Sequence, residues 1–177
     1  MISIEAVKDR YEVLISNNAQ MMSELHKLTP EQLLFKPNEG AWNILQVLDH
    51  VKNAELGTLI YIKKKLKYGG LKKTNWSADI RKNLMNSINN SPVKFKMPKI
   101  LPQPNAANNL DEVKEDWGKI REQWNKQLDE YPEEHLDKAI FKHPIFGRFS
   151  LLQAMDSMIS HQNHHIHQIN RIKKKMG

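Results

Sequence analysis

Cysteine is absent from the 177-residue chain, and long apolar runs are absent as well. Without cysteine there are no disulfides, thiolate metal ligands, iron–sulfur clusters or cysteine nucleophile. No stretch reaches the roughly 18 consecutive apolar residues of a membrane helix. The first residues lack the basic and apolar regions of a signal peptide. We therefore expect a cytoplasmic protein that does not enter a membrane.

Glycine is also scarce, and the seven glycines are too scattered to form a phosphate-binding loop. The net charge is +7, from 27 Lys and Arg against 20 Asp and Glu. Many lysines gather near expected helix ends, within residues 63–67, 72–73 and 173–175, where exposed lysine is ordinary. No zinc-finger, RRM or helix-turn-helix pattern accompanies them, so we expect no specific nucleic-acid partner.

Apolar residues recur three or four positions apart in four long segments, which is the spacing of amphipathic helices. These segments are residues 3–27, 43–68, 109–130 and 150–175. Capping boxes mark several starts, for example Asn43 with Gln46 and Ser150 with Gln153. The length suits one domain, so we predict a single all-α four-helix bundle over residues 1–177.

The longest connection, residues 71–108, holds four of the eight prolines, and we expect a short helix near 77–88. A long central crossover lets the second and third helices run parallel, which gives up-down-down-up order. Further short helices are expected after Thr29 and around Pro132, and residues 143–147 are predicted to form a loop.

Four of the eight histidines fall within residues 161–167. Helical spacing places His161 and His165 on one stripe with apolar neighbours, whereas His164 and His167 share a polar stripe that we expect to face solvent. The polar stripe consists of Ser157, Ser160, His164, His167 and Arg171. His161 and His165 are one turn apart, so their imidazoles can converge on one ion.

A third ligand is offered by His50, at the edge of the apolar face of the second helix. Three neutral imidazoles with open positions are typical of a catalytic metal site, and the lack of thiolates favours Zn²⁺ or Ni²⁺. Such an ion lowers the pKa of bound water or of a substrate thiol. The alternative is a group of core histidines held by hydrogen bonds. Gln168 then either supports His165 or substrate, or bonds across a helix interface.

Three motifs resemble the DinB-like (YfiT-type) superfamily of metal-binding four-helix bundles. They are Trp42–Val51, which contains His50, His143–Gly147, and His161–Ile169. The family pattern has one histidine in the second helix and an H-x-x-x-H pair in the fourth, commonly followed by Gln-Ile. The resemblance therefore implies that His50, His161 and His165 hold a divalent metal facing a cleft.

Similar proteins include S-transferases that use bacillithiol or a related small thiol, and proteins described as metal-dependent hydrolases. We therefore expect an enzyme that transfers a low-molecular-weight thiol to an electrophilic small molecule, with Trp42, Phe146 and Gln168 near the ion. The alternatives are a hydrolase that activates water at the same site and a non-enzymatic metal- or ligand-binding module. The resemblance also implies a homodimer, and it assigns no catalytic residue besides the metal ligands.

Overall fold

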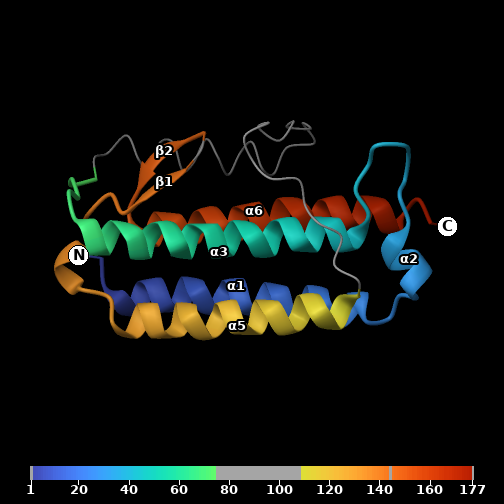
Figure 1. Cartoon of the computed structure of the whole chain (residues 1–177), viewed down its shortest axis with the longest axis horizontal. Coiled ribbons are helices and arrows are strands. Elements are labelled where there is room, and N and C mark those ends of the chain that lie inside the picture. Colours follow the sequence, from blue (N-terminus) through green and yellow to red (C-terminus); the bar gives the residue numbers. More distant parts are fainter. Residues whose placement is uncertain (1, 75–108, 144, 177) are drawn as a thin grey trace.

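The computed structural model describes residues 2–74, 109–143 and 145–176, and it is built around four long helices (Figure 1). These are α1 (Ile4–Leu25), α3 (Ile44–Tyr68), α5 (Leu110–Asp129) and α6 (Leu151–Lys173). The short elements are α2 (Pro30–Leu34), the 3₁₀ turn η1 (Glu133–His135), β1 (Phe141–His143) and β2 (Gly147–Phe149). The predicted all-α bundle is confirmed, while the helix expected near 77–88 lies outside the described residues.

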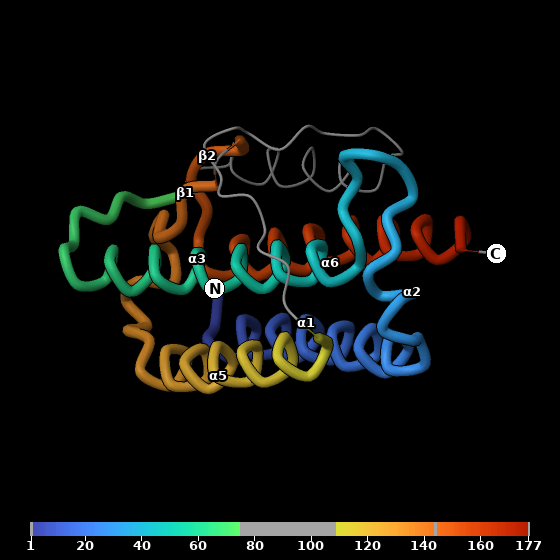
Figure 2. The backbone as a smooth tube through the Cα atoms, turned by 45° about the vertical axis from the view of Figure 1, so that its right-hand side comes forward, coloured from blue at the N-terminus to red at the C-terminus, as the bar shows by residue number. Residues whose placement is uncertain are grey.

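The helices run up-down-down-up, as Figures 1 and 2 show. Side-chain pairs at matched depth fix these directions: Arg10 with Asp156 and Asn17 with Asn163 between α1 and α6, and Lys52 with Asp116 and Lys63 with Gln123 between α3 and α5. In both pairs of helices, the residue numbers rise on both helices from one contact to the next, so the two helices of each pair are parallel. The long crossover after α3 makes the second of these pairings possible.

Capping boxes fix the starts of the two helices that carry the candidate ligands. At α3, the Asn43 side chain accepts from the Gln46 backbone N–H at 2.8 Å, and the Gln46 side chain accepts in return from the Asn43 N–H at 3.1 Å. Ser150 and Gln153 make the same exchange at the start of α6. Both caps were predicted, and they set the phase in which α3 and α6 present their histidines.

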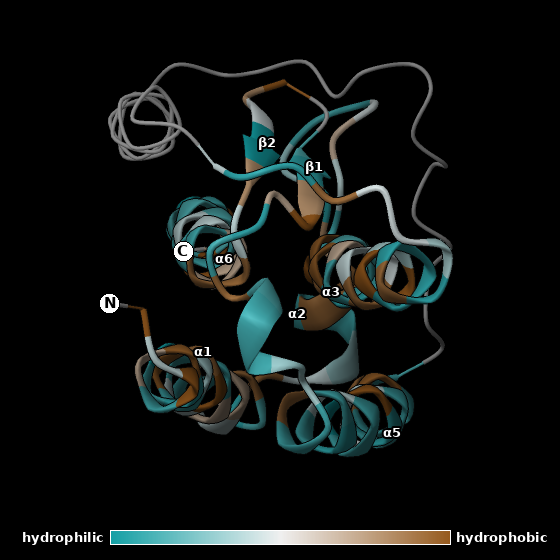
Figure 3. Ribbon diagram, turned by 90° about the vertical axis from the view of Figure 1, so that its left-hand side faces the viewer, coloured by the Kyte–Doolittle hydropathy of each residue, from teal (hydrophilic) through white to brown (hydrophobic). Residues whose placement is uncertain are grey.

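A small β-hairpin was not predicted. Residues 143–147 were expected to be a loop, but β1 and β2 flank that loop and pair antiparallel, with Phe141 opposite Phe149. Strands of three residues are too short to show alternation in the sequence, and Gly147 supplies the positive φ of 83° that the turn requires. Figure 3 shows the hairpin lying over the neighbouring helices α6 and α3.

The interior of the bundle is apolar, as the hydropathy colours of Figure 3 show, but it contains the buried carboxylate of Glu55. Glu55 on α3 is 3% exposed and accepts a hydrogen bond of 2.6 Å from Trp117 Nε1–H on α5. The Arg121 guanidinium lies 3.8 Å from the same oxygen. Burial raises the pKa of Glu55, whereas Arg121 and the Trp117 bond oppose that rise. These contacts tie α3 to α5.

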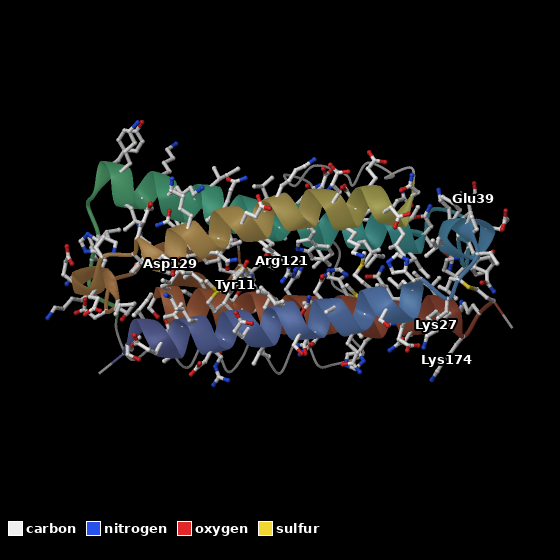
Figure 4. The ribbon with its side chains drawn as sticks, turned by 90° about the horizontal axis from the view of Figure 1, so that it is seen from below. Tyr11, Lys27, Glu39, Arg121, Asp129 and Lys174 are labelled. Atoms are coloured by element: carbon white, nitrogen blue, oxygen red, sulfur yellow. The ribbon has the colours of Figure 1, made fainter. Side chains whose placement is uncertain are left out.

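Tyr11 extends this polar group to α1. Its hydroxyl donates to the backbone carbonyl of Arg121 at 3.4 Å, and Figure 4 shows both residues in the layer between α1 and α5. The Tyr11 ring also packs against Trp124, with centroids 5.9 Å apart. One cluster around Arg121 therefore links three of the four long helices.

We expect Trp117→Phe to destabilise the protein more than Trp124→Phe. Both changes shorten a buried indole, but only the first removes the donor to Glu55, because the Trp124 Nε1–H has no partner among the described residues. The excess loss should be about 1–3 kcal/mol, the usual cost of depriving a buried charged group of its donor. Urea denaturation of the two variants at pH 7 measures it, and equal losses would contradict the role assigned to this bond.

Candidate metal centre

Three histidine side chains converge where α3 and α6 touch. The Nε2 atom of His161 lies 3.1 Å from Nε2 of His50 and 3.1 Å from Nε2 of His165. All three ligand atoms lie within 4.8 Å of one another. In the described part of the chain, no other set of three histidine or acidic side chains gathers in this way. The structure thus brings together the three residues that the sequence singled out.

The spacing and chemistry of this group suit a divalent ion. Two nitrogens at about 2.0–2.1 Å from a tetrahedral Zn²⁺ lie roughly 3.3 Å apart, close to the 3.1 Å separations here. Imidazole nitrogen is a ligand that Zn²⁺ and Ni²⁺ both accept. His50 and His161 are partly exposed, and His165 is buried. These residues fit a three-histidine centre with open coordination positions.

Gln168 fixes the tautomer of His165. Its Oε1 atom lies 2.8 Å from His165 Nδ1. An amide oxygen only accepts, so Nδ1 carries the proton and Nε2 keeps its lone pair for the centre. Histidines that bind metals commonly donate their second N–H in this way. Of the two roles weighed for Gln168, the contact supports the one within α6 and beside His165.

Burial keeps the three rings neutral. Burial and, to a smaller extent, the neighbouring His50 lower the pKa of His165 to about 3, although the Gln168 bond acts in the opposite direction. Burial also lowers the pKa of His161 well below its usual range, with added repulsion from His165 and His50. The pKa of His50 is lowered by burial as well. Neutral imidazole is the form that binds metal, so the centre is ready for an ion at neutral pH.

Trp42 and Phe146, the two aromatic residues expected near the ion, occupy different positions. The Trp42 ring lies against His50, with centroids 5.2 Å apart. Phe146 is 8% exposed and packs on His143 in the hairpin, with centroids 5.0 Å apart. Trp42 therefore contacts a candidate ligand directly, whereas Phe146 supports the hairpin.

The polar stripe of α6 is not solvated as expected. Ser157 and Ser160 are buried, and His164 is partly buried with its ring edge-on to His165 at 5.2 Å. His167 is exposed as predicted. The expectation was wrong for the first three residues because α6 packs against α1 on one side and α3 on the other, which leaves little of its circumference to solvent.

Sequence reasoning also missed a buried ion pair next to His50 in the chain. The buried Asp49 carboxylate pairs with Lys52 at 3.1 Å and accepts a hydrogen bond from Asn53 at 2.9 Å. Lys52 in turn pairs with Asp116 of α5 at 3.2 Å. The Asp-x-x-Lys spacing from 49 to 52 was a usable signal for the first pair, but the partner on α5 depends on the parallel packing.

Comparisons with known proteins agree with the fold and show the family. Residues 15–169 match the DinB superfamily, so the chain belongs to that superfamily. It is 26% identical over 164 residues to the uncharacterized protein YuaE of Bacillus subtilis strain 168, covering 92% of this chain and 97% of YuaE. The crystal structure of TT2238, a four-helix bundle protein, has a TM-score of 0.58 at 17% identity, covering 93% of this chain and 98% of that one. The last likeness concerns the fold.

None of the helices in the described ranges has the length and apolar content needed to cross a bilayer.

We expect one Zn²⁺ or Ni²⁺ per chain to bind to purified protein, with binding lost in His50→Ala and His165→Ala. Removing one of three ligands should weaken affinity at least about tenfold, the scale seen even for residues that only support ligands. His167→Gln, an exposed histidine of the same helix, is the matched control and should bind as wild type. Titration calorimetry measures this, and Ni²⁺ should also quench Trp42 beside His50. Full occupancy in His165→Ala would contradict the assignment.

Metal-free protein should lose stability as the pH falls from 7 to 5. In the unfolded chain these histidines bind protons near pH 6.5, whereas in the folded protein their lowered pKa keeps them neutral. Each ring that stays neutral therefore lowers the free energy of unfolding by about 1.4 kcal/mol per pH unit below 6.5. The raised pKa of Glu55 acts in the opposite sense above pH 4.5, because there the folded protein binds a proton that the unfolded chain does not. Comparing the slope for His165→Gln with that for wild type in EDTA isolates the histidine part, and equal slopes would refute it.

Proposed function

We propose that this protein is a metal-dependent enzyme that transfers a low-molecular-weight thiol to an electrophilic carbon, with His50, His161 and His165 as the metal ligands. The observation that carries the proposal is the convergence of three neutral imidazole Nε2 atoms, 3.1 Å from one to the next. The chain belongs to the DinB superfamily, and our proposal includes its membership in the YfiT-type group that uses small thiols.

A divalent ion held by these rings would supply Lewis acidity, which lowers the pKa of a thiol or of water. The donor set suits both reactions, and the thiol needs the smaller change in pKa. Three neutral ligands leave the charge of the ion uncompensated, and no carboxylate in the described residues joins the three Nε2 atoms. A thiol with a pKa near 8.5 needs only a small drop to ionise at neutral pH, whereas water starts near 15.7 and profits from a base.

In the transfer, the thiolate sulfur forms a bond to the electrophilic carbon, and the bond from that carbon to the leaving group breaks. The leaving group departs with the electron pair, and the thiol proton goes to solvent. Because the chain has no cysteine, the thiol is a cosubstrate and not a side chain. Trp42 would cover the His50 side of the site, and Gln168 would hold His165 with its Nε2 lone pair available.

The proposal also includes a small-molecule electrophile as the substrate, a cytoplasmic location and a homodimer. Sedimentation velocity of the purified protein measures the last of these.

Metal-loaded protein should consume an epoxide or a chlorinated aromatic only when a thiol is supplied. A panel of small thiols, assayed beside a panel of esters and amides, separates the reactions. His161→Ala should lose the activity at least a hundredfold, because the central ligand contacts both others. His167→Gln should keep it. Turnover of esters or amides without thiol would replace the transferase with a hydrolase, and no turnover of either panel would favour a metal- or ligand-binding module.

A further inference from the structure

We propose that the interior of the bundle contains a water-binding site, in which ordered water molecules are shared by the buried side chains of Asn18, Gln162 and Arg121. The site is formed by residues other than the three candidate metal ligands. It does not depend on the reaction proposed above.

A polar layer divides the core of the bundle. The buried apolar residues form two clusters, one towards each end of the long helices. The clusters leave a break at residues 15–20 of α1, 52–58 of α3, 118–119 of α5 and 159–168 of α6. Every buried residue within these ranges is polar, and they are Asn18, Lys52, Glu55, Thr58, Ser160, Gln162 and His165. The break therefore contributes polar side chains to the core from three helices.

Asn18 and Gln162 lie at the same level of the bundle. The Asn17 side chain donates to Asn163 Oδ1 at 3.4 Å, and α1 and α6 run parallel. The residue after Asn17 and the residue before Asn163 are therefore within about one helical turn of each other along the bundle. Asn18 is 8% exposed and Gln162 is 1% exposed, so both side chains point into the core.

Arg121 brings a third polar side chain from α5 into the same layer. Its guanidinium lies 3.8 Å from the carboxylate of Glu55, which is in the middle of the break on α3. Trp117 donates to that carboxylate at 2.6 Å and stands at the edge of the break on α5. The charged end of Arg121 is therefore inside the bundle, between the two apolar clusters.

These side chains carry polar atoms that the protein does not satisfy. Both amide atoms of Gln162 and the Nδ2 atom of Asn18 are buried without a hydrogen-bond partner among the described residues. The same holds for both terminal nitrogens of Arg121 and for Oε1 of Glu55. Buried polar atoms are nearly always paired with protein or with ordered water. So many unmet donors and acceptors in one layer point to a ligand that pairs with them.

Water is the ligand that suits this set of atoms. It both donates and accepts, it is small enough to lie between two packed apolar clusters, and it binds in the interior where two to four polar partners surround it. A small anion suits the layer less well. Glu55 already balances the charge of Arg121 at 3.8 Å, so an anion would add an uncompensated charge to the core.

Melting temperatures of Asn18→Leu, Gln162→Met and the double variant test the shared water. Methionine keeps the unbranched shape of glutamine but makes no amide hydrogen bonds. Gln20→Met, which changes an exposed glutamine of α1, is the matched control for the chemical change. All measurements use the full chain in EDTA, because Gln162 lies between two candidate metal ligands in the sequence.

We expect each single variant to lower the melting temperature by about 3–6 °C, because it leaves the other members of the layer without their water, whereas Gln20→Met leaves it unchanged. The double variant should lose less than the sum of the two single losses, because both changes remove partners of the same water. A higher melting temperature in either single variant would overturn the proposal, since removing an unpaired amide from a dry core is stabilising. Strictly additive losses would also overturn it.

A crystal structure of the wild-type protein at about 1.5 Å gives a second and independent test, which stands even if the double variant does not fold. We expect water oxygens within about 2.7–3.2 Å of the Gln162 amide and of Asn18 or Arg121. A direct hydrogen bond between Gln162 and Asn18 with no water beside them would contradict the proposal. An anomalous bromide peak in the layer after a bromide soak would replace water with an anion.

Discussion

The antiparallel contact between α3 and α6 is the constraint on which the candidate site depends. His50 is separated from His161 by 111 positions, yet their Nε2 atoms lie 3.1 Å apart. A shift of one helical turn along either axis, about 5.4 Å, would remove His50 from the pair on α6. The register is held from both ends, by the capping boxes at Asn43 and Ser150 and by the apolar packing between them. The packing of the two helices thereby fixes the relative positions of the three histidines.

The same packing sets the electrostatics. Three rings gathered in a partly buried site would repel one another if charged, and burial keeps them neutral instead. Gln168 fixes the tautomer of His165, because its Oε1 atom lies 2.8 Å from His165 Nδ1. Deeper in the bundle, Glu55 is paired with Trp117 and Arg121, which places the buried acid of the core on the α5 side of α3.

Much of this could be predicted because the signals were local. Helix spacing and the cap at Asn43 gave the helices nearly to the residue, and the i, i+4 spacing of His161 and His165 gave the pair. His50 was selected by its place on its helix and by family resemblance. What could not be predicted depends on contacts between elements. The hairpin is too short to show alternation, the burial of Ser157 and Ser160 follows from packing on both sides of α6, and the Glu55 bond needs the parallel arrangement of α3 and α5.

The central claim is that His50, His161 and His165 together hold one divalent ion, and the measurement that tests it most directly is X-ray absorption of the zinc- or nickel-loaded protein. The account predicts one ion per chain with three imidazole nitrogens in its first coordination sphere, at about 2.0–2.1 Å for zinc, and the remaining positions filled by light atoms from solvent. An ion coordinated by two or fewer imidazoles, or one ligated by carboxylates from elsewhere in the chain, would contradict it.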